Sequence, residues 1–200
     1  MTKAFRRINI QLGKRVRASA KKIAIIAVFS ALTIALNLSP LKFPAPYAPY
    51  LIYQIWEIPI VTAFLLYGFP TGVIIAALNT LVLLMVFPGM LLTGPLYNLA
   101  AVISMLIGVA LPKMFHKNPR WSETTEVVIF TAFGIISRVV IMTLVNWSFL
   151  RFPPPVGFAM QEQAILLALP LIAFFNATLA LYTVPLGYII AEAIKRHIKV

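Results

Sequence analysis

Arg138 and Asn146 place a guanidinium and a carboxamide within an apolar stretch, SRVVIMTLVNWSF, that covers residues 137–149. Both groups hydrogen-bond strongly, and a carboxamide offers donors as well as an acceptor. Polar groups are costly in hydrocarbon, so such residues in a membrane segment are candidates for function. Arg138, Met142 and Asn146 are four residues apart, so a helix carries them on one face. We expect this face to point into a helix bundle, where Arg138 either braces the structure or contacts a ligand.

Other apolar segments contain further polar or aromatic candidates for a binding site, namely Glu57, Asn79, Asn98, Thr143, Asn176, Tyr50 and Trp56. Several of them have a structural alternative. Asn79 and Asn98 could instead join membrane helices through hydrogen bonds, and Glu57 could lie at the membrane interface. Aromatic residues such as Tyr50 and Trp56 form either an interfacial belt or a lid over a pocket that binds a flat ligand.

No catalytic arrangement accompanies these residues. The sequence has no Cys and no Asp, and its two histidines, His116 and His197, both lie in basic segments. It contains no HExxH or Walker motif, no paired carboxylates and no Ser–His pair within a membrane segment. We therefore expect no enzyme activity, no metal site and no cofactor of the protein's own. If the protein moves a compound against a gradient, we expect the energy to come from elsewhere.

The elements that position these residues are apolar helices. Hydrophobic residues make up 61% of the 200 residues and charged residues only 11%, whereas about a quarter of a soluble domain is charged. Six apolar segments, separated by proline-rich breaks, cover about residues 22–38, 52–69, 71–87, 95–112, 126–150 and 163–194. Because a membrane-spanning helix needs about 20 apolar residues, the sequence predicts an all-α integral membrane protein with six transmembrane helices, some of them short or tilted.

The positive charges predict which side of the membrane each segment faces. Fourteen of the 17 Lys and Arg residues lie before residue 23, between residues 113 and 120, or after residue 194. This distribution indicates topology and contact with anionic lipid headgroups, not nucleic-acid binding, and it predicts cytoplasmic N- and C-termini. We expect a six-helix substrate-binding domain at 22–195 and a basic cytoplasmic tail at 196–200. The basic cytoplasmic segment 1–21 is either an amphipathic surface helix or a disordered tail.

The order of several motifs resembles the S component, the substrate-binding membrane subunit, of energy-coupling-factor (ECF) vitamin transporters. KKIAIIAVFSALTIAL at 21–36 resembles the opening helix of this family, and WEIPIVTAFLLYGFPTGVIIAALNTLVLL at 56–84 resembles its second and third helices. TGPLYNLAAVISMLIG at 93–108 resembles the fourth. RVVIMTLVNW at 138–147 and FFNATLALYTVPLG at 174–187 are most similar to the fifth and sixth helices of the riboflavin-specific branch.

This resemblance implies capture and uptake of a vitamin, riboflavin in the most similar branch, at a prokaryotic plasma membrane. The implied partners are a transmembrane T component, which would contact Ala27 and Ala31, and two cytoplasmic ATPase subunits. By the same resemblance, Asn146 and Asn176 hydrogen-bond the ligand. Their carboxamides offer the donors and acceptors that match the imide-like edge of a flavin.

Two positions depart from the riboflavin pattern. Leu179 stands where the family commonly has Lys, and Pro95 stands where it often has an acidic residue. These departures leave open an S component for another small heterocycle, such as thiamine or a queuosine precursor. Outside transport, the alternative is a membrane scaffold or sensor without a ligand.

Overall fold

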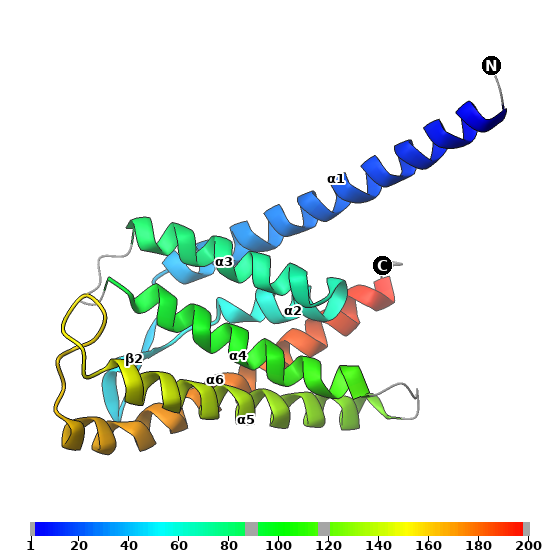
Figure 1. Cartoon of the computed structure of the whole chain (residues 1–200). Helices are drawn as coiled ribbons and strands as arrows, with labels where there is room; N and C mark the ends of the chain where they lie inside the picture. The colour runs from blue at the N-terminus through cyan, green and yellow to red at the C-terminus, as the bar shows by residue number, and fades with distance from the viewer. Residues whose placement is uncertain (1–2, 87–91, 116–120, 198–200) are drawn as a thin grey trace.

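The computed structural model describes residues 3–86, 92–115 and 121–197, with the backbone alone for residues 3–19 and 115. This part of the chain forms six helices and one two-stranded β-hairpin (Figure 1). The helices are α1 (Lys3–Leu38), α2 (Glu57–Tyr67), α3 (Phe69–Val86), α4 (Gly94–Phe115), α5 (Glu123–Phe149) and α6 (Glu162–His197). The hairpin, formed by β1 (Phe43–Ala45) and β2 (Ala48–Tyr53), lies between α1 and α2.

Each predicted apolar segment forms a helix, but the helices differ in their capacity to cross a bilayer. Within the described residues, five helices are long and apolar enough to span a membrane. The exception is α2, which has 11 residues and a length of about 16 Å at 1.5 Å per residue. A bilayer core is about 30 Å thick, so α2 covers only part of it, and six full crossings remain a prediction. The first helix extends beyond its predicted start, because α1 already begins at Lys3.

The helices run alternately in opposite directions, as short connections require (Figure 1). The hairpin and the connection between α5 and α6 lie at one end of the bundle, which we call the hairpin end. The turn between α2 and α3 and the C-terminal part of α6 lie at the opposite end. This alternation agrees with the predicted order of segments, and the assignment of the hairpin end to the outside remains a prediction.

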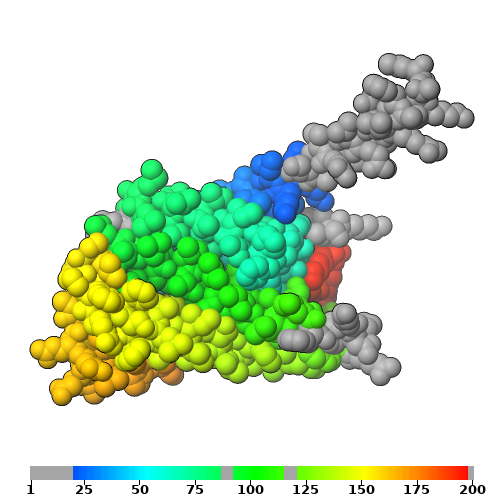
Figure 2. Space-filling model, in the orientation of Figure 1, coloured from blue at the N-terminus to red at the C-terminus, as the bar shows by residue number. Residues whose placement is uncertain are grey.

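The bundle core forms where α2 packs against α6, and where α5 packs between α4 and α6. Its fully buried side chains include Ile60, Val61, Met105 and Val184. Close backbone approach depends on Gly108, where an added Cβ would lie 2.3 Å from the carbonyl oxygen of Phe133. In Figure 2, α3, α4 and α5 lie side by side and their side chains form one face of the bundle. These helices expose large apolar side chains that suit contact with lipid.

The β-hairpin is a short addition to the helical fold that the sequence predicted. It pairs Phe43 with Tyr53 in antiparallel register, within a segment that the sequence predicted as a loop. Hydrogen bonds attach it to α6, because Tyr53 Oη lies 2.7 Å from Thr178 Oγ1 and the Tyr182 hydroxyl donates to the carbonyl of Gln54 at 2.5 Å. The hairpin is therefore fixed over one end of the helix bundle.

Candidate functional site

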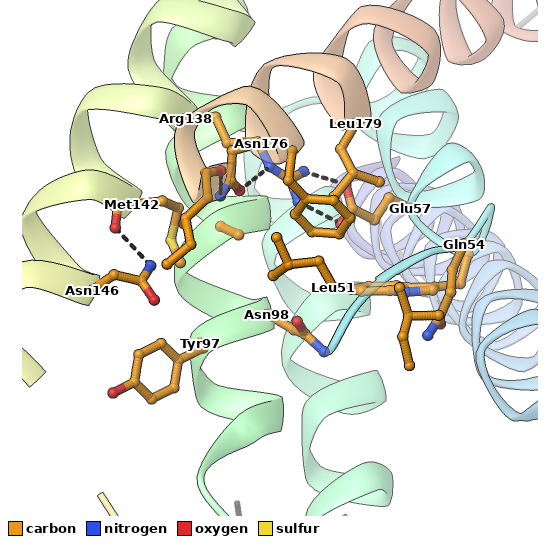
Figure 3. Close-up of a pocket in the computed structure, with 15 residues that line it drawn as sticks. Leu51, Gln54, Glu57, Tyr97, Asn98, Arg138, Met142, Asn146, Asn176 and Leu179 are labelled. Carbon is orange, nitrogen blue, oxygen red and sulfur yellow. Dashed lines mark hydrogen bonds and ion pairs between the residues drawn. The ribbon is translucent and has the colours of Figure 1, made fainter. Parts of the chain in front are cut away.

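A pocket of about 140 Å³ lies at the hairpin end, among α2, α4, α5, α6 and the hairpin (Figure 3). Its polar lining residues come from five different segments and are Gln54, Glu57, Asn98, Arg138, Asn146 and Asn176. Apolar and aromatic side chains complete the wall, among them Leu51, Trp56, Tyr97, Met142, Phe175 and Leu179. A mostly apolar cavity with a few convergent polar groups is the usual form of a small-molecule site.

A buried ion pair between Arg138 and Glu57 forms one wall of this pocket (Figure 3). Arg138 is 2% exposed and Glu57 is 3% exposed. The contact is bidentate, because Nη1 of Arg138 donates to Oε2 of Glu57 and Nη2 donates to Oε1 at 2.9 Å. Glu57 is also the first residue of α2, where the helix dipole favours a negative charge. The pair therefore joins α5 to α2 and leaves neither charge unpartnered in an apolar surrounding.

Two of the three pocket asparagines, Asn146 and Asn176, are each held by a hydrogen bond within their own helix. Asn176 Nδ2 donates to the Ile172 carbonyl at 2.9 Å, and Asn146 Nδ2 donates to the Met142 carbonyl at 2.7 Å. Asn176 Oδ1 also accepts a hydrogen bond from Arg138 Nε at 3.0 Å. Figure 3 shows Asn146 Oδ1 directed away from the Met142 carbonyl, on the side of the pocket.

Gln54 is a pocket residue that the sequence did not single out. Its Oε1 is buried and has no hydrogen-bond partner among the described residues, while its backbone carbonyl is held by Tyr182. Buried amide oxygens are nearly always hydrogen-bonded, so this acceptor in the pocket wall is available to a donor from water or a bound molecule. The sequence signal was weak, because Gln54 lies in a proline-rich and aromatic connection.

The structure brings together six of the nine residues predicted to bind substrate, namely Trp56, Glu57, Asn98, Arg138, Asn146 and Asn176. The predicted inward face of α5 is confirmed, because Arg138, Met142 and Asn146 are all buried. The sequence did not predict the pairing of Glu57 with Arg138. Among the described residues, these are the only two charged residues that are buried.

Three predicted binding residues, Asn79, Thr143 and Tyr50, do not line this pocket, and their role in binding stays a prediction. Asn79 accepts a hydrogen bond from Asn37 at 3.3 Å, so it joins α3 to α1, which is the structural alternative. Thr143 is next to Met142 in sequence, and one helical step of about 100° turns it away from the inward face. Tyr50, on β2, is 64% exposed.

The fold is similar to a solved structure described as the S component of a bacterial ECF transporter. The TM-score is 0.72, and the match covers 91% of this chain and 99% of that chain at 19% sequence identity. No protein-family profile and no curated protein matches the sequence. The likeness establishes an S-component fold for this multi-helix membrane chain, as the sequence motifs implied, and it leaves the ligand to be argued from the pocket.

Proposed function

We propose that the protein is the S component of an ECF-type transporter and that it captures riboflavin for uptake across a prokaryotic plasma membrane. The observation that carries this proposal is the pocket at the hairpin end. It presents carboxamides from Gln54, Asn98, Asn146 and Asn176 beside apolar and aromatic side chains. A flavin has the complementary form, since its tricycle is flat and one edge carries an imide with alternating acceptors and a donor. A buried amide rejects ligands that would leave it unpaired.

The charge balance of the pocket favours a neutral ligand. Glu57 is the single acid among the pocket residues that the structure describes, and both of its carboxylate oxygens bind Arg138. A cationic heterocycle such as thiamine would need a carboxylate free to pair with it, because a buried unpaired charge is costly. Riboflavin is uncharged at neutral pH, so it fits the paired state of this site.

Another neutral heterocycle is the second candidate. Leu179 lines the pocket at the position where riboflavin-type sequences commonly have Lys. A ligand with a less polar end than riboflavin would fit this side chain better.

Movement of the hairpin is part of the proposed binding step. Sites for small molecules usually measure about 300–1,000 Å³, whereas this pocket is about 140 Å³. Leu51 and Ile52 of β2 form part of its wall, so a tricyclic ligand requires the hairpin to lie further from the helices. The hydrogen bond between Tyr53 and Thr178 then stabilises the closed form.

The proposed energy source is a partner ATPase. Ala27 and Ala31 are both exposed on α1, and small residues four apart allow another helix to approach closely. This surface suits the T component, which would connect the protein to two cytoplasmic ATPase subunits.

Purification of the full-length protein in detergent tests the proposal. Riboflavin bound in the pocket should give a yellow preparation, and added riboflavin should lose fluorescence as it enters an aromatic site. A colourless protein that leaves riboflavin fluorescence unchanged would refute the riboflavin assignment. Asn79→Ala is a matched control, because it removes a buried amide outside the pocket.

A further inference from the structure

We infer that Arg138 and Glu57 are specificity-determining positioning residues, which fix the orientation of the Asn176 amide and so select the hydrogen-bonding edge of the ligand. This inference rests on the proposed capture of a small heterocycle and adds a role for the ion pair. Without such a role, a buried charge pair is a poor choice for the wall of a binding site, since apolar residues would pack at least as stably.

The Asn176 amide has a single orientation that satisfies its neighbours. Its Oδ1 accepts from Arg138 Nε at 3.0 Å, and its Nδ2 donates to the Ile172 carbonyl at 2.9 Å. Exchanging the two ends of the amide would place two donors opposite each other at Arg138 and two acceptors opposite each other at Ile172. Both hydrogen bonds would be lost together. The amide is therefore held with its oxygen turned to the ion pair.

Arg138 can hold the amide because Glu57 holds Arg138. The bidentate contact uses Nη1 and Nη2, and the planar guanidinium then leaves Nε as a donor with a fixed direction. Glu57 on α2 thus holds Arg138 on α5 in place, and Arg138 holds the amide of Asn176 on α6.

The result is a difference between Asn146 and Asn176. Asn176 uses one N–H on Ile172 and one lone pair of its oxygen on Arg138, so the donor it retains for a ligand is its second N–H. Asn146 uses one N–H on Met142, and its Oδ1 lies on the pocket side (Figure 3). Together with the unpartnered Gln54 Oε1, the pocket offers a donor from α6 and acceptors from α5 and from the connection between β2 and α2. This pattern suits a ligand edge that combines a carbonyl with an adjacent N–H.

A purely structural ion pair would behave differently from a positioning pair. If the pair only braced the bundle, its loss would lower stability and weaken every ligand by a similar factor. If it orients Asn176, its loss leaves only the Ile172 carbonyl to hold the amide, so the amide can turn at the cost of one hydrogen bond and the pocket then accepts a ligand donor in place of a carbonyl. The ratio of two affinities therefore distinguishes the two roles.

The experiment uses three small pteridines as probes of the ligand edge. Lumazine carries carbonyls at C2 and C4, pterin replaces the C2 carbonyl by an amino group, and isopterin replaces the C4 carbonyl by an amino group. Binding is measured by titration calorimetry on the full-length protein in detergent. The variants are the double replacement Glu57→Gln/Arg138→Met, which leaves no charge unpaired, and Arg138→Lys, which keeps the charge pair without the Nε donor.

We expect the wild-type protein to prefer lumazine at least tenfold over one of the amino compounds. In the double variant and in Arg138→Lys this preference should fall to threefold or less, while Asn79→Ala keeps it. An unchanged preference in both variants, or no preference in the wild-type protein, would overturn the inference. Absence of riboflavin binding would refute the proposed function alone, because the lumazine ratio is measured without riboflavin.

A second measurement tests the contact without any ligand. Asn176→Leu leaves Arg138 Nε without its acceptor, so it should lower the unfolding midpoint more in the wild-type background than in the double variant. Equal shifts in the two backgrounds would contradict the restraint of Asn176 by Arg138.

Discussion

Replacing Arg138 by methionine should destabilise the protein strongly, because the change leaves the Glu57 carboxylate buried without a partner. Glu57 is 3% exposed and receives two donors from Arg138. Breaking a buried ion pair from one side costs about 3–5 kcal/mol. Asn176 Oδ1 loses its donor in the same variant, so we expect a loss at the upper end of this range.

The intact ion pair should contribute much less to the free energy of unfolding than Arg138→Met removes. Glu57→Gln/Arg138→Met removes both charges, and replacing a buried pair by uncharged groups is often close to neutral. We expect the double variant to recover at least half of the stability lost in Arg138→Met. The matched control is Arg151→Met on the exposed surface, where substitutions usually change stability by about 0.5 kcal/mol or less.

Unfolding by SDS in mixed micelles, followed by far-UV circular dichroism, measures these differences. Two results would refute the reasoning. Arg138→Met could be as stable as Arg151→Met, which would mean that Glu57 finds another partner or is not buried. Alternatively, the double variant could be no more stable than Arg138→Met, which would mean that the unpaired charge is not the cause of the loss.

Three further predictions concern binding and assembly. Asn146→Ala should weaken riboflavin binding at least tenfold, equivalent to about 1.4 kcal/mol, whereas Asn79→Ala should bind normally; equal effects in fluorescence titrations would mean that the pocket is misplaced. Thr178→Val removes the hydrogen bond to Tyr53, worth about 0.5–1.5 kcal/mol, so stopped-flow measurements should show riboflavin leaving about two- to tenfold faster, and an unchanged rate would argue against the hairpin as the closing element. Ala27→Trp should abolish co-purification with the T component and leave riboflavin binding intact, because Ala27 is exposed; loss of both would indicate packing within the chain.

Much of the fold was accessible from the sequence because membrane helices depend on local composition. Runs of apolar residues ended by proline-rich breaks located all six helices. The four-residue spacing of Arg138, Met142 and Asn146 identified the inward face of α5, since a polar stripe on the lipid side would be too costly. These inferences need only one helix at a time.

The features that the sequence did not reveal depend on distant contacts or on short elements. Glu57 and Arg138 are 81 residues apart, so their pairing follows from how α2 and α5 pack. Asn79 was predicted to bind substrate because the sequence does not show what it pairs with. Its hydrogen-bond partner, Asn37, lies on another helix. The hairpin was missed because its first strand has only three residues and its prolines indicated a loop.

The central claim is that the pocket selects a neutral heterocycle with an imide edge, and competition between riboflavin and thiamine tests it most directly. Both ligands are titrated into the same preparation of full-length protein, in detergent and at neutral pH. We expect saturable binding of riboflavin at one site per chain, and no competition from thiamine in hundredfold excess. Binding of thiamine without riboflavin binding would contradict the account, because it would require the Glu57 carboxylate to be free of Arg138.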